Sequence, residues 1–364
     1  MSTSLSGITK LDMMVSQLPE EDRLRFRRIF RVNKVVGYLE HPEAMHPWVE
    51  KQFGSLENVS RQEIVKITNL VTNEGALFNS IRSSRPMDVR SRLEVETMAM
   101  DESLNDPLNE PERMTPEDLF GRVKGKFCIS ASNIAKYDAL HGLIIFDQHN
   151  PLRFDRERIV DYINTGWRWA QRAHLWDPEA HYFLFIWNCL WKAGASLPHG
   201  HAQVVLARDG HYAKIEALRQ AASAYRLRYG TNYFEDLYLS HLSVACATEM
   251  EGIKILSYLT PIKEKEVMLI GKEINTPFLE AVHDVLACLR DSYNVASFNL
   301  MLTCPPLDGT EPGWEDFPAA LVRIVDRGNP RNNTCDIGAM ELYASSVISV
   351  DPIEMACFLR ECVL

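Results

Sequence analysis

Residues 188–207 read Asn188-Cys-Leu-Trp-Lys-Ala-Gly-Ala-Ser-Leu-Pro-His-Gly-His-Ala-Gln203-Val-Val-Leu-Ala207. The aromatic and β-branched run at 182–187 predicts a strand before this segment, and its Gly, Ala, Ser and Pro residues predict a loop. A second strand is expected over 201–207. Because side chains alternate between the faces of a strand, His199, His201 and Gln203 should project to one side. Such polar groups fill a core poorly, but they can hold a phosphate.

The chemistry of these groups favours attack on phosphorus. The neutral imidazole of His201 has a lone pair, and a histidine pKa of about 6.5 leaves it largely unprotonated at neutral pH. Attack would give a phosphoramidate and split one displacement into two easier steps. Gln203, Ser196 and the backbone N–H groups from Gly194 to Ser196 can donate to phosphate oxygens. The alternative is a histidine pair on the surface of an edge strand, which the flanking glycine, serine, proline and glutamine disfavour.

Gly194-Ala-Ser-Leu-Pro-His-Gly-His-Ala-Gln203 resembles the active-site motif of the histidine-triad superfamily. It is similar to the branch in which glutamine replaces the third histidine, which contains galactose-1-phosphate uridylyltransferases and diadenosine tetraphosphate phosphorylases (ATP adenylyltransferases). The resemblance implies that His201 becomes nucleotidylated and that Gln203 holds the α-phosphate. It also implies a role for Asn188, because the family has an asparagine eleven residues before the first histidine, here His199.

The order of predicted elements indicates a duplication. Strands at 125–130 and 141–146, a helix at 155–174 and strands at 182–187 and 201–207 form one series. The later series has strands at 254–260 and 266–271, a helix at 277–292, and strands at 296–303 and 319–326, without a His-x-His-x-Gln motif. We therefore expect an α+β fold of two histidine-triad-like half-units with an antiparallel sheet and packed helices, as the resemblance also implies.

The N-terminal region is expected to be an accessory helical segment. Residues 19–30 place charges around an apolar stripe, and residues 60–71 begin with a Ser-x-x-Glu capping box. The predicted division is 1–75 for this segment, 76–210 for the catalytic half and 211–364 for the degenerate half. Residues 100–116 are acidic and rich in Pro and Asn, which predicts an exposed loop or linker.

Further polar residues are candidates for substrate binding. The segment Asn133-Ile-Ala-Lys136 and the later His141 resemble a segment of the diadenosine phosphorylases, which implies that Asn133, Lys136 and His141 face the nucleotide. For His141, a structural role at the start of a strand is the alternative. Arg82 and Arg85 lie in a turn-rich segment, and arginine is suited to bidentate phosphate contact. A solvated surface pair is the alternative for these two arginines.

The cysteines argue against a metal. Many uridylyltransferases bind zinc through a C-x-x-C pair, a further histidine and the first histidine of the motif, but the eight cysteines here are scattered singly. We therefore expect no zinc and no other cofactor, with His199 orienting His201 or the leaving group through a hydrogen bond. Single cysteines without a secretory signal also predict a reducing, cytoplasmic setting.

Composition narrows the function. A net charge of −10 disfavours binding to nucleic acid, and no apolar run reaches transmembrane length. The expected activity is ping-pong nucleotidyl transfer from a nucleotide or nucleotide-sugar to a sugar phosphate or phosphate, in the manner of a hexose-1-phosphate uridylyltransferase. The alternatives are a phosphorylase of diadenosine tetraphosphate or of a nucleotide-sugar, and a non-catalytic nucleotide-binding protein. A homodimer would agree with the resemblance, because uridylyltransferases share active-site residues between subunits.

Overall fold

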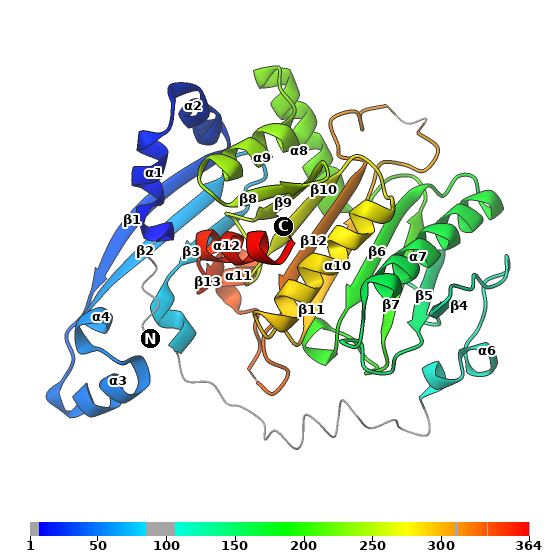
Figure 1. Ribbon diagram of the computed structural model, residues 1–364, viewed down its shortest axis with the longest axis horizontal. Coiled ribbons are helices and arrows are strands. Elements are labelled where there is room, and N and C mark those ends of the chain that lie inside the picture. Colours follow the sequence, from blue (N-terminus) through cyan, green and yellow to red (C-terminus); the bar gives the residue numbers. More distant parts are fainter. Residues whose placement is uncertain (1–6, 85–105, 310–311, 333, 364) are drawn as a thin grey trace.

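The computed structural model describes residues 7–84, 106–309, 312–332 and 334–363 (Figure 1). The strands are β1 (Phe30–Tyr38), β2 (Arg61–Asn69), β3 (Gly75–Phe78), β4 (Cys128–Ser132), β5 (Leu140–Phe146), β6 (Tyr182–Asn188), β7 (His201–Ala207), β8 (Ala247–Met250), β9 (Ile253–Ser257), β10 (Val267–Gly271), β11 (Phe298–Thr303), β12 (Ala320–Asp326) and β13 (Ser346–Ile348). The α-helices are α1 (Leu11–Gln17), α2 (Glu20–Ile29), α3 (His46–Phe53), α4 (Leu56–Ser60), α6 (Pro111–Met114), α7 (Arg156–Trp176), α8 (Ala213–Tyr229), α9 (Tyr233–Ser243), α10 (Thr276–Asp291), α11 (Ala339–Tyr343) and α12 (Pro352–Val363).

A nine-stranded sheet in the order β4-β5-β7-β6-β11-β12-β10-β9-β8 forms the centre of the molecule. From one edge of the sheet toward its centre, the strands of the first half are β4-β5-β7-β6. From the other edge, after the edge strand β8, the strands of the second half are β9-β10-β12-β11. Each half inserts one long helix, α7 or α10, between its second and third strand in the chain. The halves therefore repeat one topology and meet at the antiparallel β6–β11 pair, where Asn188 lies opposite Asn299. This arrangement confirms the predicted α+β fold with duplicated half-units.

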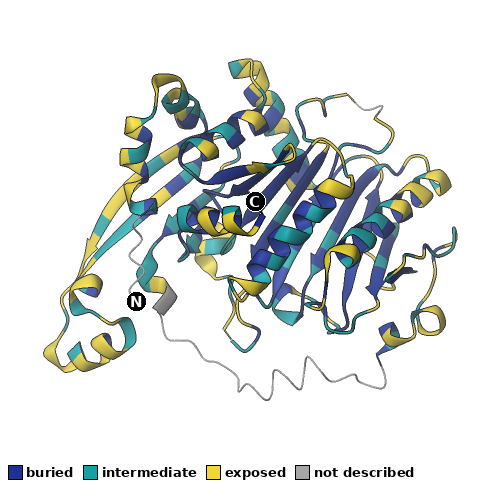
Figure 2. Cartoon of the chain, in the orientation of Figure 1, coloured by how far each residue is buried: buried dark blue, intermediate teal, exposed yellow. Residues whose placement is uncertain are grey.

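Helices α7, α10 and α12 cover one face of this sheet (Figure 1). The side chain of Asp155 caps α7 by accepting a hydrogen bond from the backbone N–H of Arg158 at 2.9 Å. Gly166 lets the helix approach β6, because a Cβ atom there would lie 2.9 Å from Phe185. Burial of large side chains such as Trp169, each worth about 1.5–3 kcal/mol, holds this layer together. Figure 2 shows the resulting continuous buried sheet beneath helices that are exposed only on their outer sides.

The opposite face carries the smaller sheet, in the order β1-β2-β3-β13, together with α8 and α9. The prediction of an entirely helical N-terminal segment is wrong, because residues 61–69 form β2 and Ser60 ends α4 instead of capping a helix. Val65, Ile67 and Asn69 are buried in alternation, and this period of two fits a strand paired with β1. The predicted boundary between residues 75 and 76 falls inside β3, and the division at residue 210 stays a prediction.

The predicted exposed linker also needs correction where it is described. Residues 100–105 lie outside the described residues, but Asp106 and Leu108 are buried, and Leu108 packs against Ile129 and Ile145. Prolines 107 and 111 each start a short helical turn that folds this segment onto the sheet. The segment consequently lies beside the predicted active site instead of extending into solvent.

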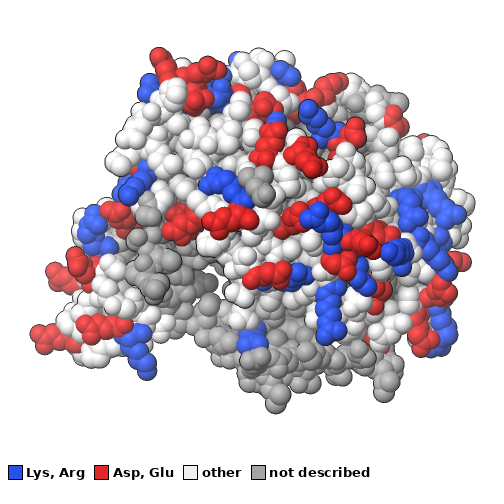
Figure 3. All heavy atoms as spheres, viewed as in Figure 1, with Lys and Arg blue, Asp and Glu red and all other residues white. Residues whose placement is uncertain are grey.

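Three further observations concern the helices, the surface charge and the cysteines. Among the described residues, no helix combines the length and apolar character needed to cross a lipid bilayer. On the face shown in Figure 3, acidic and basic side chains are interspersed. The eight cysteines are all unpaired thiols.

Candidate active site

The motif occupies the loop between the neighbouring strands β6 and β7. The loop begins with Leu190 at a φ of 66° and makes a short 3₁₀ turn that ends at Gly194, whose φ is 98°. The backbone N–H of Gly194 donates to Trp191 at 3.0 Å, and that of Ala195 donates to Leu190 at 3.2 Å. The loop uses these two N–H groups to close on itself, and their donation to phosphate stays a prediction. Ser196 is exposed, and its phosphate contact stays a prediction.

The tautomer of His201 is set by the backbone. Its Nδ1–H donates to the carbonyl oxygen of His199 at 2.8 Å, so Nε2 carries the lone pair. Burial lowers the pKa of the His201 imidazole, and this keeps the ring neutral. His201 is therefore prepared as a nucleophile. The bond uses the backbone carbonyl of His199 and not its side chain, so the predicted orientation of His201 by the His199 side chain needs correction. A contact of that side chain with the leaving group stays a prediction.

Gln203 is oriented by His141 of the adjacent strand β5. The Nε2–H of His141 donates to Oε1 of Gln203 at 2.9 Å, and its Nδ1 accepts from the backbone N–H of Tyr137 at 2.8 Å. This bond engages the Gln203 carbonyl and leaves its amide N–H groups as the donors for a ligand. His141 has no exposed surface. It therefore positions Gln203, and the prediction that it contacts substrate needs correction.

The other two residues of that segment lie around His141. Lys136 donates from Nζ to the His141 carbonyl at 3.0 Å and to the Ser132 hydroxyl at 2.8 Å. The side-chain nitrogen of Asn133 lies 3.2 Å from Nε2 of His141. The structure thus brings Asn133, Lys136 and His141 to Gln203, and contact of Asn133 and Lys136 with substrate stays a prediction.

Asn188 is connected to the second half of the chain. Its Oδ1 accepts from Nδ2 of Asn299 at 2.7 Å, and the same Nδ2 donates to the Ala193 carbonyl at 2.9 Å. Oδ1 of Asn299 accepts from Arg327 at 2.6 Å, and Asp336 binds that guanidinium at 2.7 and 3.0 Å. Sequence reasoning did not find Asn299 or Arg327, because no local pattern links them to a loop more than 100 residues away.

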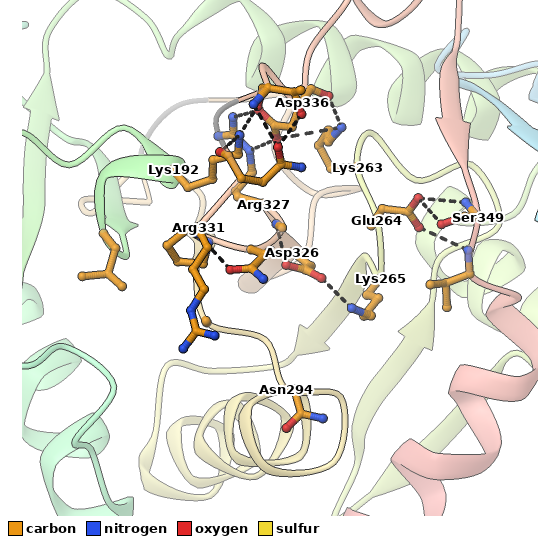
Figure 4. A pocket seen from close by; sticks show the side chains of 18 of the residues that line it. Lys192, Lys263, Glu264, Lys265, Asn294, Asp326, Arg327, Arg331, Asp336 and Ser349 are labelled. Carbon is orange, nitrogen blue, oxygen red and sulfur yellow. Dashed lines mark hydrogen bonds and ion pairs between the residues drawn. The ribbon is translucent and has the colours of Figure 1, made fainter. Parts of the chain in front are cut away.

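A cavity of about 1200 Å³ is lined by His149 and His199, and two further cavities lie near the motif. One of them, of about 810 Å³, lies beside the loop (Figure 4). Arg82 and Lys192 line it, and a position in such a cavity is what the predicted contact between Arg82 and substrate requires. Most cations there are paired, since Lys192 donates to backbone carbonyls and Lys265 binds Asp326 at 2.5 Å. Arg82 therefore stays a candidate, whereas Arg85 lies outside the described residues.

The other cavity, of about 610 Å³, lies over the sheet face that carries Gln203. Ile186 and Met301 form part of its floor, and β6 pairs Ile186 with Gln203 on one side and Met301 on the other. Asn299 also lines it. An apolar floor beside convergent polar groups is typical of a small-molecule site.

His199 belongs to a different cluster from His201. Its Nε2–H donates to the Phe146 carbonyl at 3.0 Å, which makes Nδ1 an acceptor. That Nδ1 lies 3.2 Å from Nδ1 of His149 and 3.0 Å from Oδ1 of Asn109. Asp106 completes a set of donor atoms in which those of Asp106, His149 and His199 all lie within 4.8 Å of one another. Oxygen and imidazole donors at such separations fit a divalent cation, so the absence of a C-x-x-C pair does not exclude a metal.

Comparisons with known proteins agree with this architecture. No protein-family model matches the chain, and no curated protein matches it. Among solved structures, an ADP-glucose phosphorylase from Arabidopsis thaliana with bound ADP-glucose matches with a TM-score of 0.61 and 18% identity, over 80% of this chain and 96% of that one. A galt-like protein from Arabidopsis thaliana matches at 0.59 and 17%, over 82% and 98%.

A uridylyltransferase structure matches with a TM-score of 0.55 and 14% identity, over 82% of this chain and 98% of that one. At these identities the likeness concerns the fold. It confirms the architecture that the motif resemblance implied. The chain has the duplicated histidine-triad-like fold that these uridylyltransferase and phosphorylase structures share.

Proposed function

We propose that the protein is a nucleotidyltransferase that transfers a nucleoside monophosphate through a covalent intermediate on His201. The observation that carries this proposal is the hydrogen bond from Nδ1 of His201 to the His199 carbonyl, which leaves Nε2 as a lone-pair nucleophile. The orientation of Gln203 by His141 supports it, because the Gln203 amide N–H groups can then donate to a phosphate oxygen.

In the first step, Nε2 of His201 attacks the α-phosphorus of the donor. A P–N bond forms, the bond from phosphorus to the bridging oxygen breaks, and the leaving phosphate keeps the electron pair. In the second step, a phosphate oxygen of the acceptor attacks the same phosphorus and the P–N electron pair returns to Nε2. In this proposal Gln203 donates to the charge that develops on the phosphoryl oxygens, and the hydroxyl of Ser196 in the loop does the same.

The donor class is inferred from the comparisons. The ADP-glucose phosphorylase structure contains a nucleotide-sugar, and a uridylyltransferase shares the fold. We therefore favour a nucleotide-sugar donor and a hexose-1-phosphate acceptor, as in hexose-1-phosphate uridylyltransferases. The second candidate is a phosphorylase, in which inorganic phosphate is the acceptor, because a phosphorylase carries the same architecture.

The test is the intact mass of the protein after separate incubation with UDP-glucose, ADP-glucose, GDP-mannose and diadenosine tetraphosphate. We expect one donor to add a single nucleoside monophosphate, and the mass that is added identifies the base. The adduct should be acid-labile, because phosphoramidates are, and should be absent in His201→Gly. The matched control is His46→Gly, which changes a histidine of α3 and should label normally.

The acceptor is then identified by adding hexose 1-phosphate or inorganic phosphate to the isolated adduct and measuring which one removes it. Binding of a donor without an adduct would contradict the proposal and favour the non-catalytic nucleotide-binding alternative. A homodimer and a cytoplasmic location also stay predictions, and light scattering of the purified protein tests the former.

A further inference from the structure

The second half of the large sheet contains a counterpart of Gln203. Ile186 of β6 and Met301 of β11 lie opposite each other where the two halves meet. On the far side of β6, Gln203 lies opposite Ile186. On the far side of β11, Arg323 of β12 lies opposite Met301. Because residues that pair across antiparallel strands share a face, Arg323 projects from the same face of the sheet as Gln203 and is its equivalent in the duplicated fold.

Each of these two residues is held by a buried partner from the next strand. His141 lies on β5, two residues before the residue opposite Gln203, and its Nε2–H donates to Gln203. Glu266 immediately precedes β10 and lies two residues before the residue opposite Arg323. Its Oε1 accepts from Nε of Arg323 at 2.5 Å, and its side chain is almost fully buried, as that of His141 is. The second half therefore repeats the arrangement of an orienting residue and an oriented nitrogen donor.

The second half does not repeat the nucleophile. His201 lies two residues before Gln203, and the residue at the equivalent place before Arg323 is Leu321. Leu321 is fully buried and has no lone pair for attack on phosphorus. This half therefore keeps the means to position a ligand and lacks the group that would react with it.

Arg323 presents a hydrogen-bond donor to a cavity. Its Nη1 donates to Glu74 at 2.8 Å, whereas its Nη2 is buried and has no hydrogen-bond partner in the described part of the chain. A buried donor that is left unpaired is unfavourable, because it has lost its bonds to water without gaining others. Arg323 lines the cavity of about 610 Å³ described above, so an acceptor bound there can complete the guanidinium.

This cavity belongs mainly to the second half. Apart from Ile186, the sheet residues that line it come from β11 and β12, and much of the remaining wall comes from α8 and from the turn between β2 and β3. Among the described residues, those that line it include neither His201 nor Gln203. Its volume lies within the range of small-molecule sites.

The surroundings of Arg323 favour an uncharged aromatic ligand. Glu74 and Glu266 both pair with the guanidinium, so the cluster holds no surplus positive charge with which to bind a phosphate. A flat ring fits between the sheet and α8, and the sulfur of Met301 favours contact with an aromatic system. Apolar side chains from both layers line the cavity, namely Ile186, Met301, Ile215 and Leu218.

We propose that this cavity is a second, non-catalytic site for an uncharged aromatic heterocycle, such as the base of a nucleoside, and that Nη2 of Arg323 donates to an acceptor on the ring. The site is distinct from the one at His201. Its occupancy does not depend on the proposed transfer reaction, so the two can be tested separately.

The experiment is photolabelling of the full-length protein with 8-azidoadenosine and, separately, with 5-azidouridine, followed by mapping of the labelled peptides. We expect one of these probes to label α8 or β11, and an excess of the unmodified nucleoside to prevent the labelling. Label that maps only to β4, β5, β7 or the motif loop would overturn the proposal, because the nucleoside would then occupy the His201 site alone. The absence of label that the unmodified nucleoside competes away would also overturn it.

A cavity-filling variant tests the site without disturbing the Arg323 cluster. Ala221 of α8 lines the cavity, so Ala221→Trp should abolish labelling of α8 and β11 and leave nucleotidylation of His201 at its normal rate. Ala224→Trp is the matched control, because Ala224 is an exposed residue of the same helix outside the lining. Loss of both labelling and nucleotidylation in Ala221→Trp alone would overturn the proposal, since the cavity would then be part of the catalytic site. Labelling of α8 or β11 in a protein that never nucleotidylates His201 would support the second site and contradict the proposed function alone.

Two double variants test the equivalence of the halves. Glu266→His with Arg323→Gln installs the pair of the first half and keeps an N–H donor, so labelling should persist. Glu266→Leu with Arg323→Met removes the donor and should weaken the affinity for the competing nucleoside by about tenfold or more, as expected for the loss of a hydrogen bond from a charged group. Equal affinities in the two variants would show that Arg323 does not recognise the ligand and would overturn the proposal.

Discussion

Replacing Asn299 with aspartate should slow nucleotidylation of His201 while changing global stability little. Nδ2 of Asn299 donates to Asn188 at 2.7 Å and to Ala193 at 2.9 Å, and Oδ1 accepts from Arg327 at 2.6 Å. The shape of aspartate is nearly the same, so the change removes the two donors and leaves the acceptor in place. A carboxylate oxygen then faces two carbonyl oxygens that have lost their partner.

The magnitude follows from these contacts. Each of the two lost hydrogen bonds is worth about 0.5–1.5 kcal/mol, whereas the remaining bond to Arg327 becomes an ion pair and gains about as much as one of them. The free energy of unfolding should therefore decrease by only about 0.5–1.5 kcal/mol. The two lost hydrogen bonds both hold the motif loop, so their loss falls on the loop that carries the site. If the barrier to nucleotidylation of His201 rises by about 2 kcal/mol, the labelling rate falls about 30-fold.

The assay is the rate at which the intact-mass adduct forms with the donor that labels the unchanged protein, together with urea unfolding. Asn294→Asp is the matched control, because Asn294 lies in the same half and lines the cavity of Figure 4 but takes no part in the Asn188 network. If Asn299→Asp labels as fast as Asn294→Asp, the second half does not position the motif loop, and the reasoning is refuted.

Three other predictions concern the site and the core. His141→Phe should reduce the labelling rate by about tenfold or more and destabilise the fold by about 1–3 kcal/mol, because Gln203 loses its orienting donor and the Tyr137 N–H loses its acceptor; labelling at the normal rate would contradict this. Gly200→Ala should destabilise by about 1–3 kcal/mol in urea unfolding, because the new Cβ would lie 2.6 Å from the Gln148 carbonyl, whereas Gly37→Ala, where the nearest atom is 3.9 Å away, should be nearly neutral. Burial lowers the pKa of His211 and of His241 to about 4 from 6.5, so the unfolded state takes up protons first as the pH falls. Stability should then decrease from pH 6.5 to 4 by about 3 kcal/mol for each of these histidines, and urea midpoints that stay constant over this range would argue against their buried, neutral state.

Local sequence was sufficient to predict the structure wherever the residues concerned are neighbours on one helix or strand, or on two consecutive ones. Alternation along β7 places His201 and Gln203 on the same face, and apolar spacing of 3.6 residues identified α7 and α10. The repeated strand order was also readable, because each strand is a short apolar run between turn signals. These properties come from backbone geometry, which a short segment carries by itself.

Predictions from local sequence were wrong where contacts with a segment distant in the chain outweighed the local preference. The capping pattern at Ser60 predicted a helix, but pairing with β1 buries Val65 and Ile67 and stabilises a strand instead. The acidic, proline-containing segment before residue 116 was expected in solvent, yet Leu108 finds an apolar site beside β4 and β5. In both places the free energy of tertiary burial exceeds the local preference.

The sequence by itself determined the duplicated α+β architecture, and it predicted His201 as the nucleophile and Gln203 as its partner. Only the tertiary structure showed that Asn299 and Arg327 of the second half support the motif loop, and that Asp106, Asn109 and His149 converge on His199. The physical reason is that such contacts depend on strand register across the β6–β11 pair and on how loops from different strands meet at one edge of the sheet. No periodicity within a short segment records those distances.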